Sequence, residues 1–104
     1  MIRGTSQPFK FEMPYMCDEI KAVEITFWQP NNNDYRLEKT LADCQYVSGQ
    51  KVMYITLDQV ETLGFSARYK AYTQFRGLTK DGIAFSSHVE PITVYPTIND
   101  KVLE

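Results

Sequence analysis

The chain has few of the side chains from which catalytic and metal sites are built. Its 104 residues include one histidine, His88, and two cysteines, Cys17 and Cys44. The cysteines lack the C-x-x-C spacing that zinc and redox sites favour. We expect each to be a small buried side chain in a reducing compartment. A disulfide between them, or a thiol paired with His88, stays open from the sequence.

Motifs that cradle phosphate or activate a nucleophile are also absent. The sequence has no G-x-G-x-x-G, G-x-x-x-x-G-K-S/T or G-x-S-x-G pattern, and no D-x-D-x-D-G loop or H-x-x-x-H pair. The adjacent carboxylates Asp18 and Glu19 fall in an expected loop, where solvation accounts for them. We therefore expect no enzyme, with no catalytic residues, no cofactor and no metal site.

Neither a strong charge nor a long apolar run is present. Eleven Lys and Arg residues against thirteen Asp and Glu residues give a formal net charge of −2, so no positive field would gather phosphates or anionic headgroups. No apolar run approaches the roughly 18–20 residues that cross a bilayer, and Met1–Thr5 does not resemble a signal peptide. We expect a cytoplasmic protein that binds neither nucleic acid nor membranes.

What the chain does contain is a period-two alternation of apolar and polar residues, which recurs from Phe9 to Phe85 and is typical of half-buried strands. Turn signals interrupt it about every ten residues. The alternation on Val23, Ile25 and Phe27 is the clearest in the first half. The expected strands cover residues 9–13, 22–28, 35–40, 44–47, 51–57 and 67–78, followed by a last strand from residue 83.

Turn and cap signals indicate how these strands connect. The segment Gln29–Asp34 predicts a surface loop between paired strands, and the Asp-Gly pair in Thr79–Gly82 predicts a hairpin turn. Ser48–Gln50 predicts a turn that pairs residues 44–47 with 51–57. Thr56–Gln59 matches a capping box, so a short helix with Gly64 as its left-handed C′ residue should connect strands of different sheets. On that helix, Val60 and Leu63 would share one face.

The last strand changes phase at Pro91. Phe85 and Val89 fall on the expected inner face, whereas Ile92 falls on the opposite one. A bulge or a change of sheet would resolve the slip, and the missing proline N–H favours an edge position.

Together these signals predict an all-β fold: an antiparallel, immunoglobulin-like β-sandwich of about seven strands with one short connecting helix. Residues 1–96 would form the single domain and residues 97–104 a loosely attached tail. The Cys-Trp-Cys arrangement of antibody domains is not reproduced, because Trp28 follows Cys17 too closely.

Outward aromatic residues form the candidate functional feature. Strand phase directs Trp28, Tyr54 and Tyr72 away from the core, and aromatic and arginine side chains are enriched at protein interfaces. The candidate interaction face consists of Trp28, Tyr54, Arg68, Tyr72 and Arg76. Two other interpretations stay open: these aromatic residues only shield the strands, or they form a platform on which sugars stack.

A set of short motifs is spread over nearly the whole chain. They are Met1–Thr5 with Pro8-Phe9, Leu37-Glu38-Lys39, Asp43-Cys44, Thr56-Leu57-x-Gln59-x-Glu61-Thr62-Leu63-x-Phe65, Arg76-x-Leu78-Thr79-x-Asp81-Gly82 and Asn99-Asp100-x-Val102-Leu103. In order and spacing they resemble a group of short proteins encoded in phages and prophages of Firmicutes, near tail or minor structural genes. The chain departs from that group in its longer, asparagine-rich loop Pro30–Asp34.

The resemblance implies a setting and no catalytic motif. It implies a non-enzymatic structural or assembly module of a phage or prophage, associated with the tail or baseplate. Its partners would be proteins, either virion components or further copies of itself in a homo-oligomer. It would be found in the cytoplasm of the bacterial host or in the virion. The alternative is a carbohydrate-binding or adhesion module of the same fold.

Overall fold

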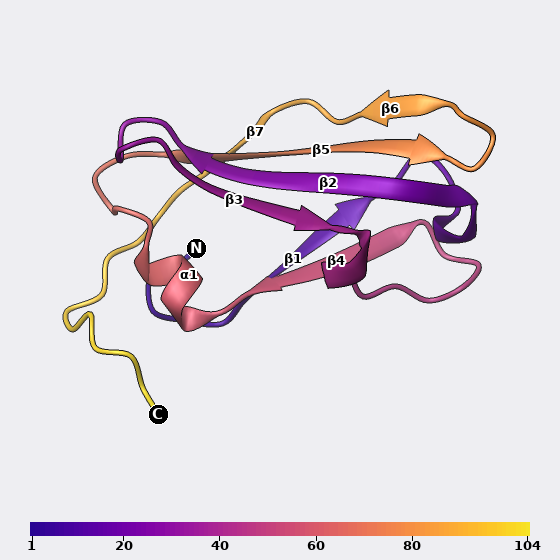
Figure 1. The fold of residues 1–104 in the computed structure, drawn as a ribbon. Helices are drawn as coiled ribbons and strands as arrows, with labels where there is room; N and C mark the ends of the chain where they lie inside the picture. The colour runs from indigo at the N-terminus through magenta and orange to yellow at the C-terminus, as the bar shows by residue number, and fades with distance from the viewer.

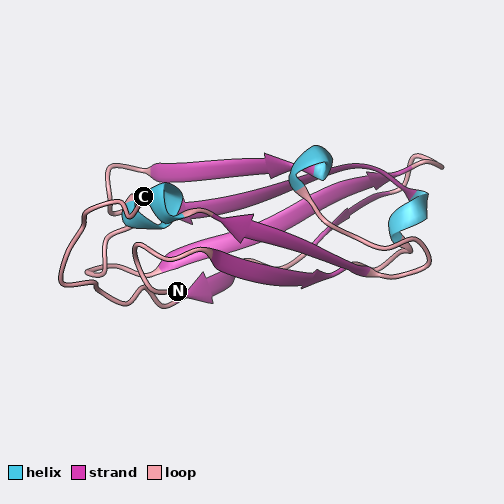
Figure 2. Cartoon of the chain, turned by 90° about the horizontal axis from the view of Figure 1, so that it is seen from below, coloured by secondary structure: helices cyan, strands magenta, loops and turns pink.

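The computed structural model describes residues 1–104. Seven strands form two antiparallel sheets, which confirms the expected all-β fold. The strands are β1 (Gln7–Glu12), β2 (Ile20–Gln29), β3 (Tyr35–Thr40), β4 (Val52–Leu57), β5 (Ala71–Thr79), β6 (Ala84–Ser86) and β7 (Glu90–Ile92). The α-helix α1 (Gln59–Leu63) and two 3-10 helices, η1 (Cys17–Glu19) and η2 (Leu41–Asp43), lie near the ends of the strands (Figures 1 and 2). No helix has the length and hydrophobicity that a membrane crossing requires.

The two sheets differ in width. The wider sheet has the order β3-β2-β5-β6, with β7 also paired to β5, and the narrower sheet contains only β1 and β4. The narrow pair crosses one face of the wide sheet (Figure 1). Phe9 of β1 lies 4.9 Å from Phe27 of β2 between ring centroids, and Phe11 lies 6.0 Å from Phe75 of β5. This aromatic layer joins the sheets.

Alternation along the central strands is confirmed. Ile25 and Phe27 of β2 are completely buried, as is Met53 of β4. Each such side chain contributes roughly 1.5–3 kcal/mol by leaving water. β3 has the bounds that the sequence predicts, and its pairing with β2 is confirmed.

The expected strand over residues 44–47 is wrong. Only Gln45 pairs there, through a single bridge to Tyr54, while β4 pairs with β1 along its whole length. Asp43 Oδ2 accepts the Thr40 N–H at 2.8 Å and caps η2, which carries the chain away from the sheet. β1 brings phenylalanines to the core, whereas Val47 is exposed. The Gln45 bridge lies on the edge of β4 opposite β1, because Tyr54 exchanges both of its backbone hydrogen bonds with Gln45.

The connecting helix is confirmed between β4 and β5, which belong to different sheets, but its expected cap is wrong. The N-cap is Asp58, whose Oδ1 accepts the Glu61 N–H at 2.8 Å, while Glu61 Oε1 accepts the Asp58 N–H at 3.1 Å. Thr56 belongs to β4. Val60 is exposed, and Thr62 is the buried residue of the helix.

Gly64 ends the helix for a different reason from the one expected. Its φ of −67° is right-handed, so a left-handed cap is wrong. A Cβ at this position would lie 2.2 Å from Tyr35 Oη. The tyrosine hydroxyl donates to the Glu61 carbonyl at 2.9 Å. Glycine is thus required by the close approach of β3 to the helix end.

The strand expected from Ala67 begins at Ala71, because a buried amide holds the preceding residues in a loop. Gln29 Nε2 donates to the carbonyls of Ser66 and Tyr69 at 2.7 and 2.8 Å. Gln29 Oε1 accepts from the Ser66 N–H at 2.7 Å and from Asn32 Nδ2 at 2.9 Å. All the hydrogen-bonding capacity of the amide is used inside the protein. The alternation of residues 67–78 places Tyr69 on the same face as Phe75, which predicts an inward side chain, but Tyr69 is exposed.

The phase slip near Pro91 is resolved by a bulge. β6 and β7 pair with the same edge of β5, and Gln74 and Phe75 lie opposite three residues, Ser87–Val89. Ser87 completes the bulge, because its N–H donates to the Phe75 carbonyl at 2.9 Å and its Oγ accepts the Phe75 N–H at 3.0 Å. The edge position of this strand is confirmed. The bulge leaves Val89 exposed, so its expected inner position is wrong.

Both chain ends lie along the molecule's left side in Figure 1. Ile2 forms a parallel bridge with Tyr95. Arg3 donates to the carbonyls of Phe65 and Leu63 at 2.6 and 3.0 Å, which satisfies groups at the end of α1. Beyond Tyr95 the chain has no strand or helix. This last segment is attached by an ion pair between Arg3 and Asp100 at 2.9 Å and by two hydrogen bonds between Gln59 and Leu103.

We predict that Gly77→Ala destabilises the protein, although a β-strand usually tolerates alanine better than glycine. A Cβ at Gly77 would lie 2.2 Å from Cζ of Phe85, and that ring is confined by Phe75 and Tyr15 at 6.2 and 5.5 Å between centroids. The free energy of unfolding in urea should fall by about 1–3 kcal/mol. In a Phe85→Ala background the same substitution should cost nothing. Equal costs in both backgrounds would contradict the expected clash.

We predict a larger loss for Gln29→Leu. The substitution leaves a buried N–H and two carbonyls unpaired, which should lower the free energy of unfolding by about 3 kcal/mol or more. Gln7→Leu is the matched control, because Gln7 Nε2 bonds only the neighbouring Pro8 carbonyl, and it should change stability by less than about 0.5 kcal/mol. Similar urea midpoints for both variants would contradict the role assigned to the Gln29 amide.

Candidate interaction face

The outer face is the surface of the wide sheet turned away from β1 and β4. Trp28 of β2 and Tyr72 and Arg76 of β5 lie on it, with Trp28 directly opposite Tyr72 and their ring centroids 6.5 Å apart. Tyr54 is exposed on β4, in the other sheet, and Arg68 lies in the connection between α1 and β5. The structure therefore brings together three of the five candidate residues.

Arg36 joins this cluster, although sequence reasoning left it out. It lies opposite Trp28 across the β2–β3 pair, with its guanidinium carbon 5.3 Å from the centroid of the indole ring. The indole N–H of Trp28 donates to Asp34 in the hairpin loop. Asp34 and Asn33 both have positive φ, at 57° and 52°, which asparagine and aspartate tolerate in turns. The loop geometry thus sets the register that places arginine over tryptophan.

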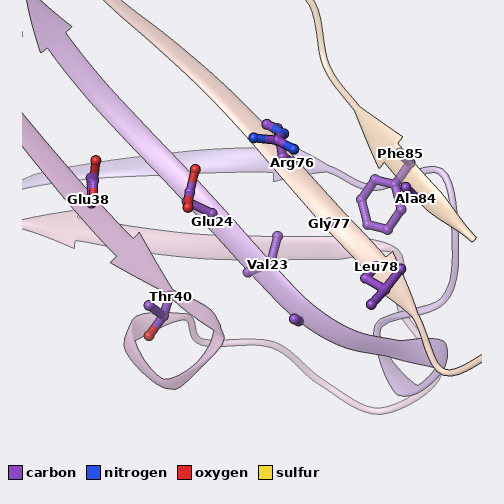
Figure 3. Close-up of a pocket in the computed structure, with 10 residues that line it drawn as sticks. Val23, Glu24, Glu38, Thr40, Arg76, Gly77, Leu78, Ala84 and Phe85 are labelled. Carbon is purple, nitrogen blue, oxygen red and sulfur yellow. The ribbon is translucent and has the colours of Figure 1, made fainter. Parts of the chain in front are cut away.

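The outer face is hollowed beside the cluster. One hollow of about 450 Å³ is lined by Glu38, Glu24 and Arg76 from β3, β2 and β5, and by small residues such as Ala22 and Ala84 (Figure 3). A second hollow of about 290 Å³ is lined by Trp28, Arg36 and Tyr72, and shares Glu24 and Arg76 with the first. The short side chains lie beside these long charged ones and leave the space open. We call the two hollows together the trough.

Three charges in the trough have no ionic partner within the chain. Glu24 lies opposite Arg76 in the sheet register, and Glu38 stands on the next strand. The four ion pairs of the molecule use other residues. Exposed charges that make no internal pair lose nothing internal when a ligand of matching charge binds. The trough therefore offers both signs of charge beside an aromatic cluster.

The cysteines offer little nucleophilic chemistry. Both are free thiols, and Cys17 is almost completely buried. Burial raises the pKa of Cys17, with the charge of Asp18 adding to the effect. Burial raises the pKa of Cys44 to about 11, again helped by a neighbouring carboxylate, Asp43. A raised pKa disfavours the thiolate, which is the reactive form. No group of three or more His, Cys, Asp and Glu side chains is arranged to hold a metal ion.

No protein-family model matches the chain, and the curated proteins include no significant match.

We predict that both thiols react slowly with a thiol-specific reagent at about pH 8 in the folded protein. Burial and the raised pKa values of Cys17 and Cys44 keep thiolate scarce, so labelling followed by mass spectrometry should be much slower than in urea. The urea-unfolded protein is the control, because its thiols return to a pKa of about 8.5. Rapid labelling of either cysteine in the folded state would contradict the environments described.

Proposed function

We propose that the chain is a non-enzymatic assembly module of a phage or prophage, associated with the tail or baseplate, which binds other virion proteins through its outer face. The observation that carries the proposal is the cluster of Trp28, Arg36 and Tyr72 beside the unpaired charges of the trough. Aromatic and arginine side chains are the residues that dominate binding energy at protein interfaces.

The strand order supports an immunoglobulin-like version of the fold. The wide sheet, β3-β2-β5 followed by β6 and β7, has the order C′-C-F-G of a variable-type domain, and the β1–β4 pair corresponds to strands B and E. Strands equivalent to A and D are missing from the narrow sheet. In this assignment the outer face is the exposed surface of the sheet containing C, F and G.

A protein partner suits the cluster better than a sugar. Stacking a sugar requires an open ring face, and Arg36 covers one face of the Trp28 ring. The indole N–H of Trp28 is already donated to Asp34. A protein partner can use the arginine and the ring edges as they stand. We therefore prefer the assembly module to the alternative, a carbohydrate-binding or adhesion module.

The phage setting rests on the resemblance of the short motifs, in order and spacing, to the group of phage and prophage proteins. One of them carries Glu61 of the helix cap, and another contains the hairpin turn at Asp81-Gly82, with Gly82 at a φ of 85°. Within that setting, the protein would accumulate in the bacterial cytoplasm before joining the virion.

We predict that the double variant Trp28→Ala/Tyr72→Ala loses its place in phage particles. Quantitative mass spectrometry of purified particles should show incorporation reduced by about tenfold or more, because hot-spot side chains each contribute about 2 kcal/mol. Tyr54→Ala removes an exposed aromatic residue from the other sheet and is the matched control. It should be incorporated normally. Circular dichroism of each purified variant verifies folding.

Two results would contradict the proposed function. The wild-type protein would be missing from particles that carry all other tail proteins, or the Tyr54 control would lose incorporation to the same extent as the double variant. In the second case the outer face would have no special role.

A further inference from the structure

β3 is an uncovered edge of the wide sheet. It is the first strand in the sheet order and pairs only with β2. An edge strand presents unpaired N–H and C=O groups, which can pair with another chain. Which groups are free follows from the direction of the hydrogen bonds across the sheet.

The free groups belong to Arg36 and Glu38. Both the N–H and the carbonyl of Phe75 are bonded to Ser87, on the far side of β5. Ile25 lies opposite Phe75 but cannot bond it, because both backbone groups of Phe75 are used on the far side. The backbone groups of Ile25 therefore point to β3, where Ile25 pairs with Lys39. Because the direction alternates along an antiparallel strand, the even-numbered residues of β3 direct their backbone groups away from β2.

The hydrogen bonding of Thr40 agrees with this alternation and limits the free edge. Its N–H would be the next outward donor, and it is already bonded to Asp43 Oδ2 at 2.8 Å. At the other end of the strand, β3 is preceded by Asp34 of the hairpin loop, whose positive φ departs from strand geometry. Arg36 and Glu38 are therefore left as the two residues with both backbone groups available.

We propose that β3 pairs in antiparallel fashion with β3 of a second copy of this chain, with Arg36 opposite Glu38 of the second copy and Leu37 at the twofold axis. Each copy contributes two N–H and two C=O groups to the new ladder. Such an interface is isologous, because the same residues lie on both sides. The pairing goes beyond binding to a virion partner and does not depend on it.

Charge selects this register over its neighbours. Only residues whose backbone groups point to the free edge can pair with each other. The register can therefore shift only by two residues. One shift places Arg36 opposite Arg36 of the second copy, and the other places Glu38 opposite Glu38. Either shift sets like charges directly opposite, which destabilises a sheet, whereas the proposed register contains two pairs of opposite charge. Both side chains stand on the outer face, and the guanidinium of Arg36, which lies over Trp28 of β2, would turn toward Glu38 of the second copy.

Packing of Leu37 adds to the interface. Its side chain points to the inner face, where it is only half buried and contacts the edge of the core. In the proposed register, Leu37 of one copy meets Leu37 of the other across the axis. Apolar surface that a single copy leaves in water would thus be covered in the dimer.

The other candidate edge, β1, is less suitable despite a similar charge pattern. Its Lys10 and Glu12 already approach each other within the strand at 4.0 Å, and Pro8 removes a donor from the edge. Phe11 of β1 packs under Phe75 of β5, so the wide sheet extends beyond β1 through β6. A second copy beside β1 would meet this overhanging part of the sheet.

Sedimentation equilibrium of the full chain at concentrations up to about 1 mM should show a monomer–dimer equilibrium. Arg36→Glu and Glu38→Arg should each weaken dimerisation by about tenfold or more, because each converts both cross-strand pairs to like charges. Lys10→Glu is the control for Arg36→Glu, because it also replaces a positive charge with a negative one, but on the other edge strand, β1. Its dimerisation should equal that of the wild type.

Mixing the two single variants separates the proposed pairing from misfolding. In a mixed dimer every Glu again faces an Arg, so Arg36→Glu and Glu38→Arg, each defective alone, should associate with each other at close to wild-type strength. A wild type that stays monomeric throughout the concentration range, or a mixture no stronger than its components, would overturn the proposal. Either result would leave the binding of a different protein through Trp28 and Tyr72 untouched.

Discussion

The buried amide of Gln29 is the interaction on which the candidate face depends. It lies at the end of β2, where the β2–β3 loop and the connection after α1 meet, and it bonds Ser66, Tyr69 and Asn32 at once. A buried polar group of this kind is stabilising only when all its partners are present. The network therefore holds both loops in one arrangement. Trp28, the residue before it, takes its orientation from the same strand end.

The outer face inherits its order from this support. Asp34 can bind the Trp28 indole only because the loop returns the chain at a defined register, which Asn32 helps to set through its bonds to Gln29 and to the Gly64 carbonyl at 2.9 Å. That register then places Arg36 over the ring. A rigid aromatic and cationic cluster loses little conformational entropy on binding, which favours a specific protein interface over a loose one.

Local patterns predicted the strands whose alternation is strong, and failed where distant residues decide. Period two identified β2, β3 and β4 because one side of each strand must be buried. Residues 44–47 carried a weaker pattern, and only Gln45 pairs with β4, on the edge opposite β1, because the Thr40–Asp43 cap turns the chain into η2 just before this segment. The helix cap shifted from Thr56 to Asp58 because Glu61 reciprocates the bond. Arg36 was missed because its position over Trp28 depends on hairpin register.

Arg36 links the outer face to the sheet edge. Its side chain belongs to the aromatic cluster on the outer face, and its backbone groups are free at the edge of β3. The guanidinium lies over Trp28 of β2, so it must turn toward the free edge when a second strand approaches β3. Edge strands of soluble proteins usually carry charges that prevent uncontrolled pairing. On β3 a positive and a negative residue alternate. Two of the possible registers place like charges opposite each other and are disfavoured, whereas the third pairs Arg36 with Glu38. Self-association through the edge would then place two outer faces in one continuous surface, so that a partner with repeated subunits meets two aromatic clusters at a fixed spacing. Such bivalent contact strengthens binding without any new kind of contact.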